Sequence, residues 1–342
     1  MAGEAAVRSG CGRVTASRPR RARPPSRTPS RRLVAFVALA GLLAAGIPAL
    51  AEGGTAAPDG SAPVADAGAP PTAGLSDEER RARVQELADR AARQLENRQY
   101  RDAIATLNQA LELEPDSAAL YAAKGWVSFY GGEVDWALRH FEKALELNPT
   151  HVKAWNGKGL ILLGREDYDG AARAFARSTL YVPGHAPTWR FRAMALSKGG
   201  KLKRALACVK QAIRLEPENP DNHELRGVIL FSMGRYPEAL AAFERVLELD
   251  PRREDAWLSK GSCLVKLGRA EEGLEAFDQA LRWNPLSPVA LYNKAVTLEA
   301  LGRADEAVRY LKKSLAIRPG YAEAETALAR LQGHGAPGRA VR

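Results

Sequence analysis

Few residues of this chain have the types and spacing that catalysis or metal binding requires. His151 and His185 lie 34 residues apart, and two histidines without a third ligand make a poor metal site. The pair His223 and Glu224 stands alone, and the sequence contains no H-E-x-x-H motif, no C-x-x-C pair and no phosphate-binding glycine loop. We therefore expect no catalytic residue, no metal site and no cofactor, and we predict that the chain is not an enzyme.

The clearest pattern in the sequence is a period of 34 residues. Seven prolines follow one another at this interval: Pro115, Pro149, Pro183, Pro217, Pro251, Pro285 and Pro319. A period of this length is typical of stacked repeats, and such an array grows by adding units rather than by enlarging one core. The pattern therefore predicts an elongated repeat domain, of the kind that usually binds other molecules and leaves chemistry to other domains.

Small and large residues occupy fixed columns of the repeat. With each proline at position 32, the seven units begin at residues 84, 118, 152, 186, 220, 254 and 288. Positions 8 and 20 contain only alanine or glycine, position 27 is small or short, and position 24 is bulky. Small residues let two helices approach closely, and a bulky residue fills the space that they leave. Glycines near position 15, such as Gly132 and Gly234, end the first helix, so each unit is predicted to be a helix–turn–helix.

These columns, with aromatic residues at positions 4 and 24, resemble the tetratricopeptide repeat (TPR). The W-x-x-K-G sequence from Trp155 to Gly159, which recurs from Trp257 to Gly261, is similar to a common form of its first helix. The resemblance covers Val84 to Tyr321 and implies an all-α fold, a right-handed superhelical α-solenoid of TPR helix–turn–helix repeats. Unit one departs most from the pattern, because it has Leu87 at position 4 and no turn glycine.

We expect the repeat domain to occupy residues 76–332. A capping-box pattern at residues 76–79 opens its first helix, and residues 322–332 would add a cap helix at the open end. Residues 333–342 are expected to form a disordered tail. Cys208 and Cys263 fall in different units, so we expect no disulfide between them.

The first 51 residues are typical of a signal peptide or signal anchor. A basic head (1–32) precedes an apolar segment (33–51) that ends in Ala49-Leu50-Ala51, the spacing of a signal-peptidase site. Cleavage would release the chain, whereas an apolar segment of about 20 residues could also stay uncut and anchor it. Residues 52–75, rich in alanine, glycine and proline, are expected to form a flexible linker. We expect a periplasmic or extracellular protein, with a membrane-anchored form as the alternative and the choice between Sec and twin-arginine export open.

The net charge of +10 is concentrated near the N-terminus. Residues 1–32 hold nine arginines and one glutamate, so everything after residue 32 carries a net charge of only +2. A near-neutral body lacks the electrostatic footprint that polyanions require. We therefore expect no nucleic-acid partner, and a membrane contact only through the N-terminal segment.

One side of each first helix is available for a partner. Positions 2, 5, 9, 12 and 13 lie opposite the positions that pack the unit internally, and the TPR resemblance implies that they form the concave, ligand-holding face. Reading this face through the units predicts a peptide-binding groove lined by Trp126, Phe129, Tyr130, Lys153, Asn156, Leu160, Leu163, Arg190, Met194, Lys198, Glu224, Val228, Phe231, Leu258 and Tyr292. The groove would be apolar along its floor, basic in units three and four and acidic in unit five, which suits an extended peptide or an amphipathic helix.

Several of these residues also have a purely structural explanation. Positions 9 and 12 would equally pack against neighbouring first helices. Trp126, Phe129 and Tyr130 place three aromatic rings on one arc, so we predict that they bind the partner and that alanine at Trp126 and Tyr130 abolishes capture without unfolding the array. Position 7 is basic in every unit; an anion-binding ladder is one interpretation, and we favour stems that pack between units and charges that reach helix-end carbonyls.

These observations predict an exported TPR scaffold or adaptor that binds a protein partner through a peptide or amphipathic helix, in envelope or secretion-complex assembly. A membrane-anchored assembly factor with an uncleaved N-terminal helix is the alternative. The lysine and asparagine pattern with which some TPR proteins clamp a C-terminal carboxylate is absent from the units.

Overall fold

The computed structural model describes residues 75–334, which form fifteen α-helices and, within this part of the chain, no strand. The helices are α2 (Asp77–Glu96), α3 (Tyr100–Leu113), α4 (Ala118–Tyr130), α5 (Val134–Leu147), α6 (Val152–Gly164), α7 (Tyr168–Tyr181), α8 (Ala186–Lys198), α9 (Leu202–Leu215), α10 (Pro220–Ser232), α11 (Tyr236–Leu249), α12 (Glu254–Lys266), α13 (Ala270–Trp283), α14 (Pro288–Ala300), α15 (Ala304–Ile317) and α16 (Ala322–His334). The predicted signal segment, the linker up to residue 74 and the tail from residue 335 lie outside the described residues.

Both ends of the described array follow the sequence closely. The predicted capping box opens α2, since Ser76 Oγ accepts a hydrogen bond from the Glu79 N–H (3.2 Å) and the Glu79 carboxylate accepts one from the Ser76 N–H (2.8 Å). At the other end, α16 is the predicted cap helix. It continues to His334, so the predicted helix end at Gln332 is two residues too early.

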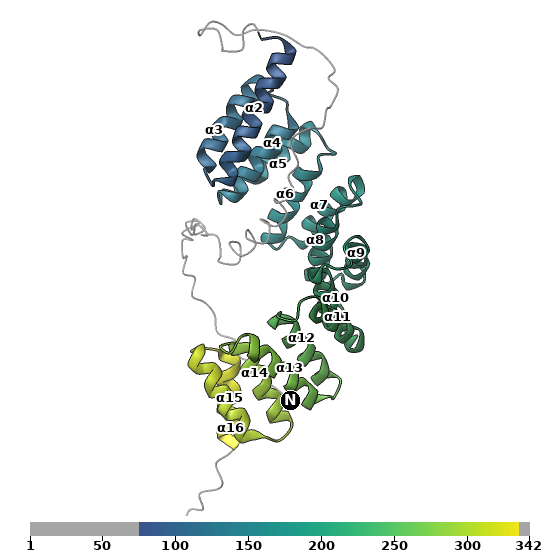
Figure 1. Ribbon diagram of the computed structural model, residues 1–342, viewed down its shortest axis with the longest axis vertical. Coiled ribbons are helices and arrows are strands. Elements are labelled where there is room, and N and C mark those ends of the chain that lie inside the picture. The colour runs from purple at the N-terminus through teal and green to yellow at the C-terminus, as the bar shows by residue number, and fades with distance from the viewer. Residues whose placement is uncertain (1–74, 335–342) are drawn as a thin grey trace, which may run out of the picture.

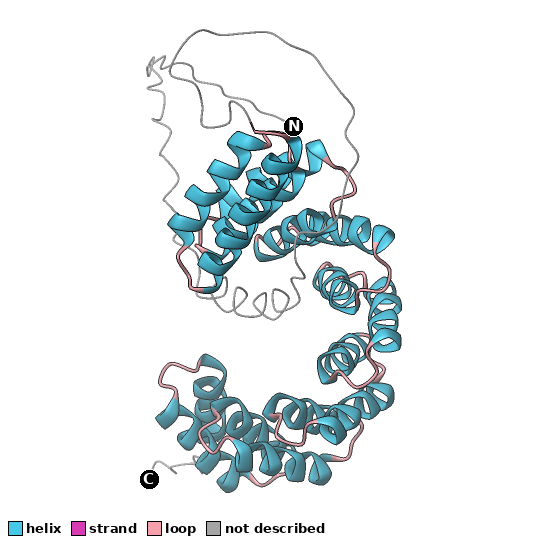
Figure 2. Ribbon diagram, turned by 45° about the horizontal axis from the view of Figure 1, so that its top comes forward, coloured by secondary structure: helices cyan, strands magenta, loops and turns pink. Residues whose placement is uncertain are grey.

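The helices stack in chain order along the length of the molecule (Figure 1). The two helices of a unit pack on each other, and the second helix then contacts the first helix of the next unit. Consecutive first helices from α4 to α14 also contact one another, whereas consecutive second helices make few direct contacts. First helices therefore lie on the inner side of the curve that Figure 2 shows, and second helices on the outer side. This arrangement confirms the predicted α-solenoid.

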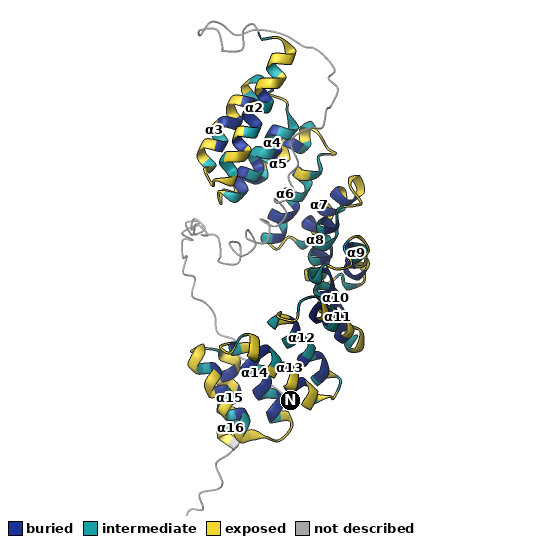
Figure 3. Cartoon of the chain, in the orientation of Figure 1, coloured by how far each residue is buried: buried dark blue, intermediate teal, exposed yellow. Residues whose placement is uncertain are grey.

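The closest helix–helix approach within a unit lies between positions 8 and 24. Where position 8 is glycine, a Cβ atom there would lie 2.5–2.7 Å from the phenylalanine ring at position 24, closer than two heavy atoms can pack. The four pairs are Gly125–Phe141, Gly159–Phe175, Gly227–Phe243 and Gly261–Phe277. All four rings are almost fully buried. Figure 3 colours the buried residues along the helices dark blue. The bulky column thus fills the space beside the small column, as the sequence predicts.

The remaining three units fill the space between their two helices with a different pair of residues. They carry alanine at position 8 and leucine or valine at position 24: Ala91–Leu107, Ala193–Val209 and Ala295–Leu311. All six side chains are buried. The larger residue at position 8 always accompanies the smaller residue at position 24, so the combined volume stays within the space between the helices.

Position 15 adopts a left-handed backbone conformation in every unit. Five units use glycine, with φ between 73° and 83°, whereas units one and three use Arg98 (φ 59°) and Glu166 (φ 64°). This conformation costs a residue with a Cβ atom about 1 kcal/mol, and helix packing on both sides of the turn offsets the cost. The turn in unit one therefore forms without the glycine that its neighbours use.

The pairing of positions 8 and 24 predicts strong coupling between them. We expect Gly227→Ala to lower the free energy of unfolding by about 1–2 kcal/mol, because the new methyl group displaces the Phe243 ring. Phe243→Leu alone leaves a cavity, but the double variant reproduces the pairing of units one and seven. Its destabilisation should be smaller than the sum of the single effects by about 1 kcal/mol or more in urea unfolding. Additive single effects would contradict this account.

Candidate functional site

The inner face of the solenoid is the surface on which the sequence places a partner. Three of its predicted lining residues are not accessible: Phe129, Leu160 and Leu163 have exposed fractions of only 2%, 1% and 4%. Leu160 and Leu163 belong to α6, which contacts α4 on one side and α8 on the other. Neighbouring helices cover these side chains, and the prediction that the three residues line an open groove is wrong.

The aromatic cluster of unit two packs mainly on itself and on its own second helix. The Trp126 ring meets the Phe141 ring of α5 edge-on, with centroids 5.3 Å apart, and stacks with Tyr130 at 5.9 Å. Phe129 completes the cluster, 5.8 Å from Trp126 and 5.7 Å from Tyr130. Burial, with a contribution from Tyr100, raises the pKa of Tyr130 to about 12. These contacts favour the structural explanation of the cluster over an exposed anchor.

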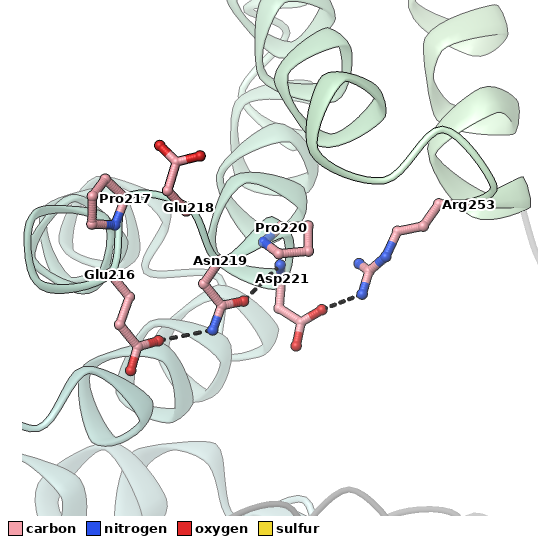
Figure 4. Close-up of a pocket in the computed structure, with 7 residues that line it drawn as sticks. All are labelled: Glu216, Pro217, Glu218, Asn219, Pro220, Asp221 and Arg253. Carbon is pink, nitrogen blue, oxygen red and sulfur yellow. Dashed lines mark hydrogen bonds and ion pairs between the residues drawn. The ribbon is translucent and has the colours of Figure 1, made fainter.

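The charged residues of unit five are paired inside the protein. Arg253, the residue that precedes α12, places Nη2 2.5 Å from Oδ1 of Asp221 and Nη1 2.5 Å from Oε2 of Glu224 (Figure 4 shows the pair with Asp221). On the opposite side, Arg190 Nη1 lies 3.4 Å from Oδ1 of Asn222 and 4.0 Å from Oδ2 of Asp221. Burial raises the pKa of Glu224 in spite of the positive charge of Arg253. Arg190 of the predicted basic stretch and Arg253 therefore bind the acidic residues of unit five and join α8, α10 and the start of α12.

Sequence reasoning missed Arg253 because it lies at position 34, outside the positions assigned to the inner face. The spacing in the sequence could have indicated this contact. Arg253 follows Asp221 by 32 residues, and residues nearly one period apart lie on adjacent units. An arginine at this spacing from an acidic residue predicts an ion pair between units.

An open hollow of about 620 Å³ lies beside this ion network, lined by residues 216–221 and Arg253 (Figure 4). Its polar groups are already engaged. Asn219 donates to Glu216 (2.8 Å) and accepts from the Asp221 N–H (3.0 Å), while Glu218 accepts from Arg245 (2.9 Å). The hollow therefore offers little to a ligand beyond groups that the protein uses for its own stacking.

Four predicted groove residues form an accessible apolar surface further along the inner face. Val228 on α10 has an exposed fraction of 43%, and Met194, Phe231 and Leu258 are half-buried on α8, α10 and α12. Of these three helices, α10 lies in the middle and contacts both α8 and α12. We call Met194, Val228, Phe231 and Leu258 the inner-face patch.

The remaining predicted residues are divided between solvent and contacts within the protein. Lys153 and Lys198 are exposed and make no ion pair within residues 75–334. Asn156 accepts a weak hydrogen bond from Thr188 of the next unit (3.4 Å), and the Tyr292 ring packs against that of Tyr321 at 5.3 Å. Of the predicted charges on this face, the two lysines thus remain available to a partner.

The basic residues at position 7 reach back to the preceding unit. Lys158 donates to Glu142 (2.9 Å), Lys260 lies 3.1 Å from Glu244, and Lys294 donates to Asp278. In every pair the acid occupies position 25 of the preceding second helix. The expectation that these three charges reach helix-end carbonyls is wrong, because carboxylates of the neighbouring unit stand closer.

Chemistry-bearing residues do not gather elsewhere in the described part of the chain. Residues 75–334 contain no group of three or more side chains placed to hold a metal ion, and no helix among them has the length and apolar character to span a bilayer. Cys208 and Cys263 are free and buried, and burial raises the pKa of the Cys263 thiol to about 11.

A family model for the tetratricopeptide repeat matches residues 88–135, 123–181, 192–254, 225–288 and 258–322, which together make up more than half of the chain. The chain belongs to the tetratricopeptide repeat family. Its fold fits a scaffold for protein–protein interaction, and TPR scaffolds are generally not enzymes. No curated protein matches the chain significantly.

Several solved structures of low sequence identity are similar to this chain, and two of them, with TM-scores above 0.5, share its fold. A chain of the APC/C hetero-tetramer Cut9-Hcn1 is 20% identical with a TM-score of 0.54; the match covers 73% of this protein and 48% of that chain, so this protein spans about half of it. A tetratricopeptide repeat protein from Parabacteroides merdae is 12% identical with a TM-score of 0.55, over 73% and 99% of the two chains. MamA from Desulfovibrio magneticus RS-1 is 21% identical with a TM-score of 0.47, over 50% and 97%.

The packing of the unit-two cluster predicts that its removal lowers the stability of the protein and does not only weaken partner binding. Trp126→Ala combined with Tyr130→Ala should lower the free energy of unfolding by about 3 kcal/mol or more, because both rings contact the core. The matched control is Trp136→Ala on α5, whose side chain is 53% exposed and should change stability by less than about 0.5 kcal/mol. Urea unfolding followed by circular dichroism measures both; equal stability of the double variant and the native protein would restore the anchor interpretation.

Proposed function

We propose that this protein is an exported TPR scaffold that binds a peptide or amphipathic helix of a protein partner on its inner face, in envelope or secretion-complex assembly. The observation that supports the proposal is the inner-face patch, where Val228 on the first helix α10 is 43% exposed. An exposed apolar side chain among half-buried neighbours can be buried by a partner, and burial of apolar surface favours association.

The surroundings of the patch support a helix or extended peptide that carries a carboxylate beside its apolar side chains. Lys198 lies at the end of α8 without an ion-pair partner in the described chain, so it can meet a carboxylate of the ligand. The Arg190–Asp221–Arg253–Glu224 network holds the neighbouring helices in register and keeps the patch in one shape. A rigid surface loses less entropy on binding than a mobile one.

A photo-crosslinking amino acid at position 228 tests this site directly. We expect it to capture one partner in cells, which mass spectrometry of the conjugate identifies, and Val228→Asp should weaken binding of that partner about tenfold or more. The matched control places the crosslinker at Ala241, an exposed position on α11 of the same unit. Capture from position 241 but not from position 228 would overturn the inner-face assignment.

The membrane-anchored alternative differs in the fate of residues 33–51, which carry the apolar segment and the A-x-A sequence. If signal peptidase cleaves after Ala51, N-terminal sequencing of the protein from its native host yields Glu52 first. A chain that begins at or near Met1 and sediments with membranes would establish the anchored form instead. We expect the Glu52 terminus, because alanine and glycine dilute the hydrophobicity of the segment.

A further inference from the structure

The charge of the repeat domain is distributed very unevenly among its units. Unit four (residues 186–219) contains eight lysines and arginines against two acidic residues, a net charge of +6, whereas units one, two, five and six are each net negative. Its second helix, α9, carries no acidic residue. The net charge of all residues after residue 32 is close to zero because negative units offset the positive charge of unit four.

The excess gathers on the outer face, over α7 and α9. Arg173 and Arg177 on α7 and Lys203, Arg204, Lys210 and Arg214 on α9 are all exposed. None of the six lies within ion-pair distance of a carboxylate among the described residues. By contrast, Arg235 and Arg269, which precede α11 and α13, pair with Glu238 and Glu272 in the first turns of those helices.

The position-7 ladder is interrupted at the same place. Position 25 provides the acid that pairs with Lys158, Lys260 and Lys294, but unit three has Ala176 at this position and unit four has Lys210. Arg192, the position-7 residue that faces unit three, donates through Nη1 to Thr179 (3.1 Å) and lies over the Trp189 ring at 5.4 Å. Its Nε is buried and has no hydrogen-bond acceptor within the described chain. A buried donor of a charged group without an acceptor is costly unless something supplies one.

An open groove of about 950 Å³ runs beside these residues. Trp155 and Trp189 line it together with Leu162 and Leu180, and Arg173, Arg177 and Arg192 also contribute to its wall. Its two acidic residues are occupied, since Glu142 pairs with Lys158 and Asp167 accepts from the Gly170 N–H at the start of α7. Leu180, at the rim, is 66% exposed. The groove therefore combines indole and leucine surfaces with unpaired positive charge.

The geometry points to a second docking site on the outer face, the α7 groove, which takes an acidic segment of a protein partner. Aspartate or glutamate side chains of that segment would pair with Arg173 and Arg177, and an apolar side chain between them would lie against Leu180 and the indoles. Charge complementarity of this kind selects the partner and speeds its association. The site is separate from the inner-face patch and does not depend on it.

An acidic peptide fits these observations better than other anionic partners do. A lipid bilayer presents a flat surface, which contacts exposed lysines and arginines without entering a groove between helices. Duplex DNA likewise presents its phosphates along a wide cylinder, and it has no apolar side chain for Leu180. Among these partners, only a peptide supplies both carboxylates for Arg173 and Arg177 and an apolar side chain for Leu180.

The test measures binding of a fluorescein-labelled peptide of ten glutamates and two leucines to the full-length protein by fluorescence anisotropy. Arg173→Glu with Arg177→Glu should weaken binding about tenfold or more, because both charges are reversed at the site. The matched control is Arg309→Glu with Lys313→Glu, which makes the same charge change at the same two positions, 22 and 26, of unit seven. Since the control changes the net charge equally, it accounts for general attraction to the basic N-terminal head.

We expect the control to change binding less than about threefold, Arg173→Lys with Arg177→Lys to retain it, and Val228→Asp to leave it unaltered. A peptide with glutamine in place of glutamate should not bind. Equal weakening in the two charge-reversed proteins would overturn the proposal. The proposal would also be overturned if the α7 substitutions weakened binding of phosphatidylserine vesicles or duplex DNA but left binding of the peptide unchanged. All variants replace exposed residues, and unchanged circular dichroism confirms that they fold.

Discussion

The structure depends on the close approach of the two helices in each unit, which the residues at positions 8 and 24 set. A phenylalanine ring occupies the space where a glycine lacks its Cβ atom, and alanine is tolerated only opposite leucine or valine. Because interiors pack at nearly crystalline density, this pair fixes the distance between helices in every unit. Repeating one distance seven times produces a regular stack, so a local steric constraint determines the shape of the whole molecule.

Ion pairs between neighbouring units add a second, longer-range regularity. On the inner face, Arg253 and Arg190 bind the acidic residues of unit five, and on the side of the second helices position 7 pairs with position 25 of the preceding unit. Side chains used in this way are not available to a partner. Two of the four charged residues that the sequence places on the binding surface, Arg190 and Glu224, therefore contribute to stacking. Lys153, Lys198 and the inner-face patch remain for recognition.

Units three and four lack the acid at position 25, and this has a consequence for the charge of their outer face. Ala176 and Lys210 stand where units two, five and six carry the pairing acid, so Arg192 lacks a carboxylate there and the arginines of α7 make no ion pair within the described part of the chain. A regular array gains nothing from such an interruption, which costs electrostatic stability. In our proposal this positive charge binds a partner at the α7 groove, so the solenoid would hold one partner inside its curve and another outside.

The sequence by itself determined the period, the helix–turn–helix unit and the columns of small and large residues. These properties depend on contacts within a unit or at a fixed offset along the chain, where one residue's neighbour is known from its number. It could not decide which residues of the inner face are accessible. Phe129, Leu160 and Leu163 share that face with Val228, yet only Val228 is exposed, because accessibility depends on how neighbouring units cover each side chain. The same holds for Arg253: only the stacked helices bring its guanidinium to Asp221 and Glu224. Local packing follows from the order of residues, whereas the free surface is what remains after the units have packed on one another.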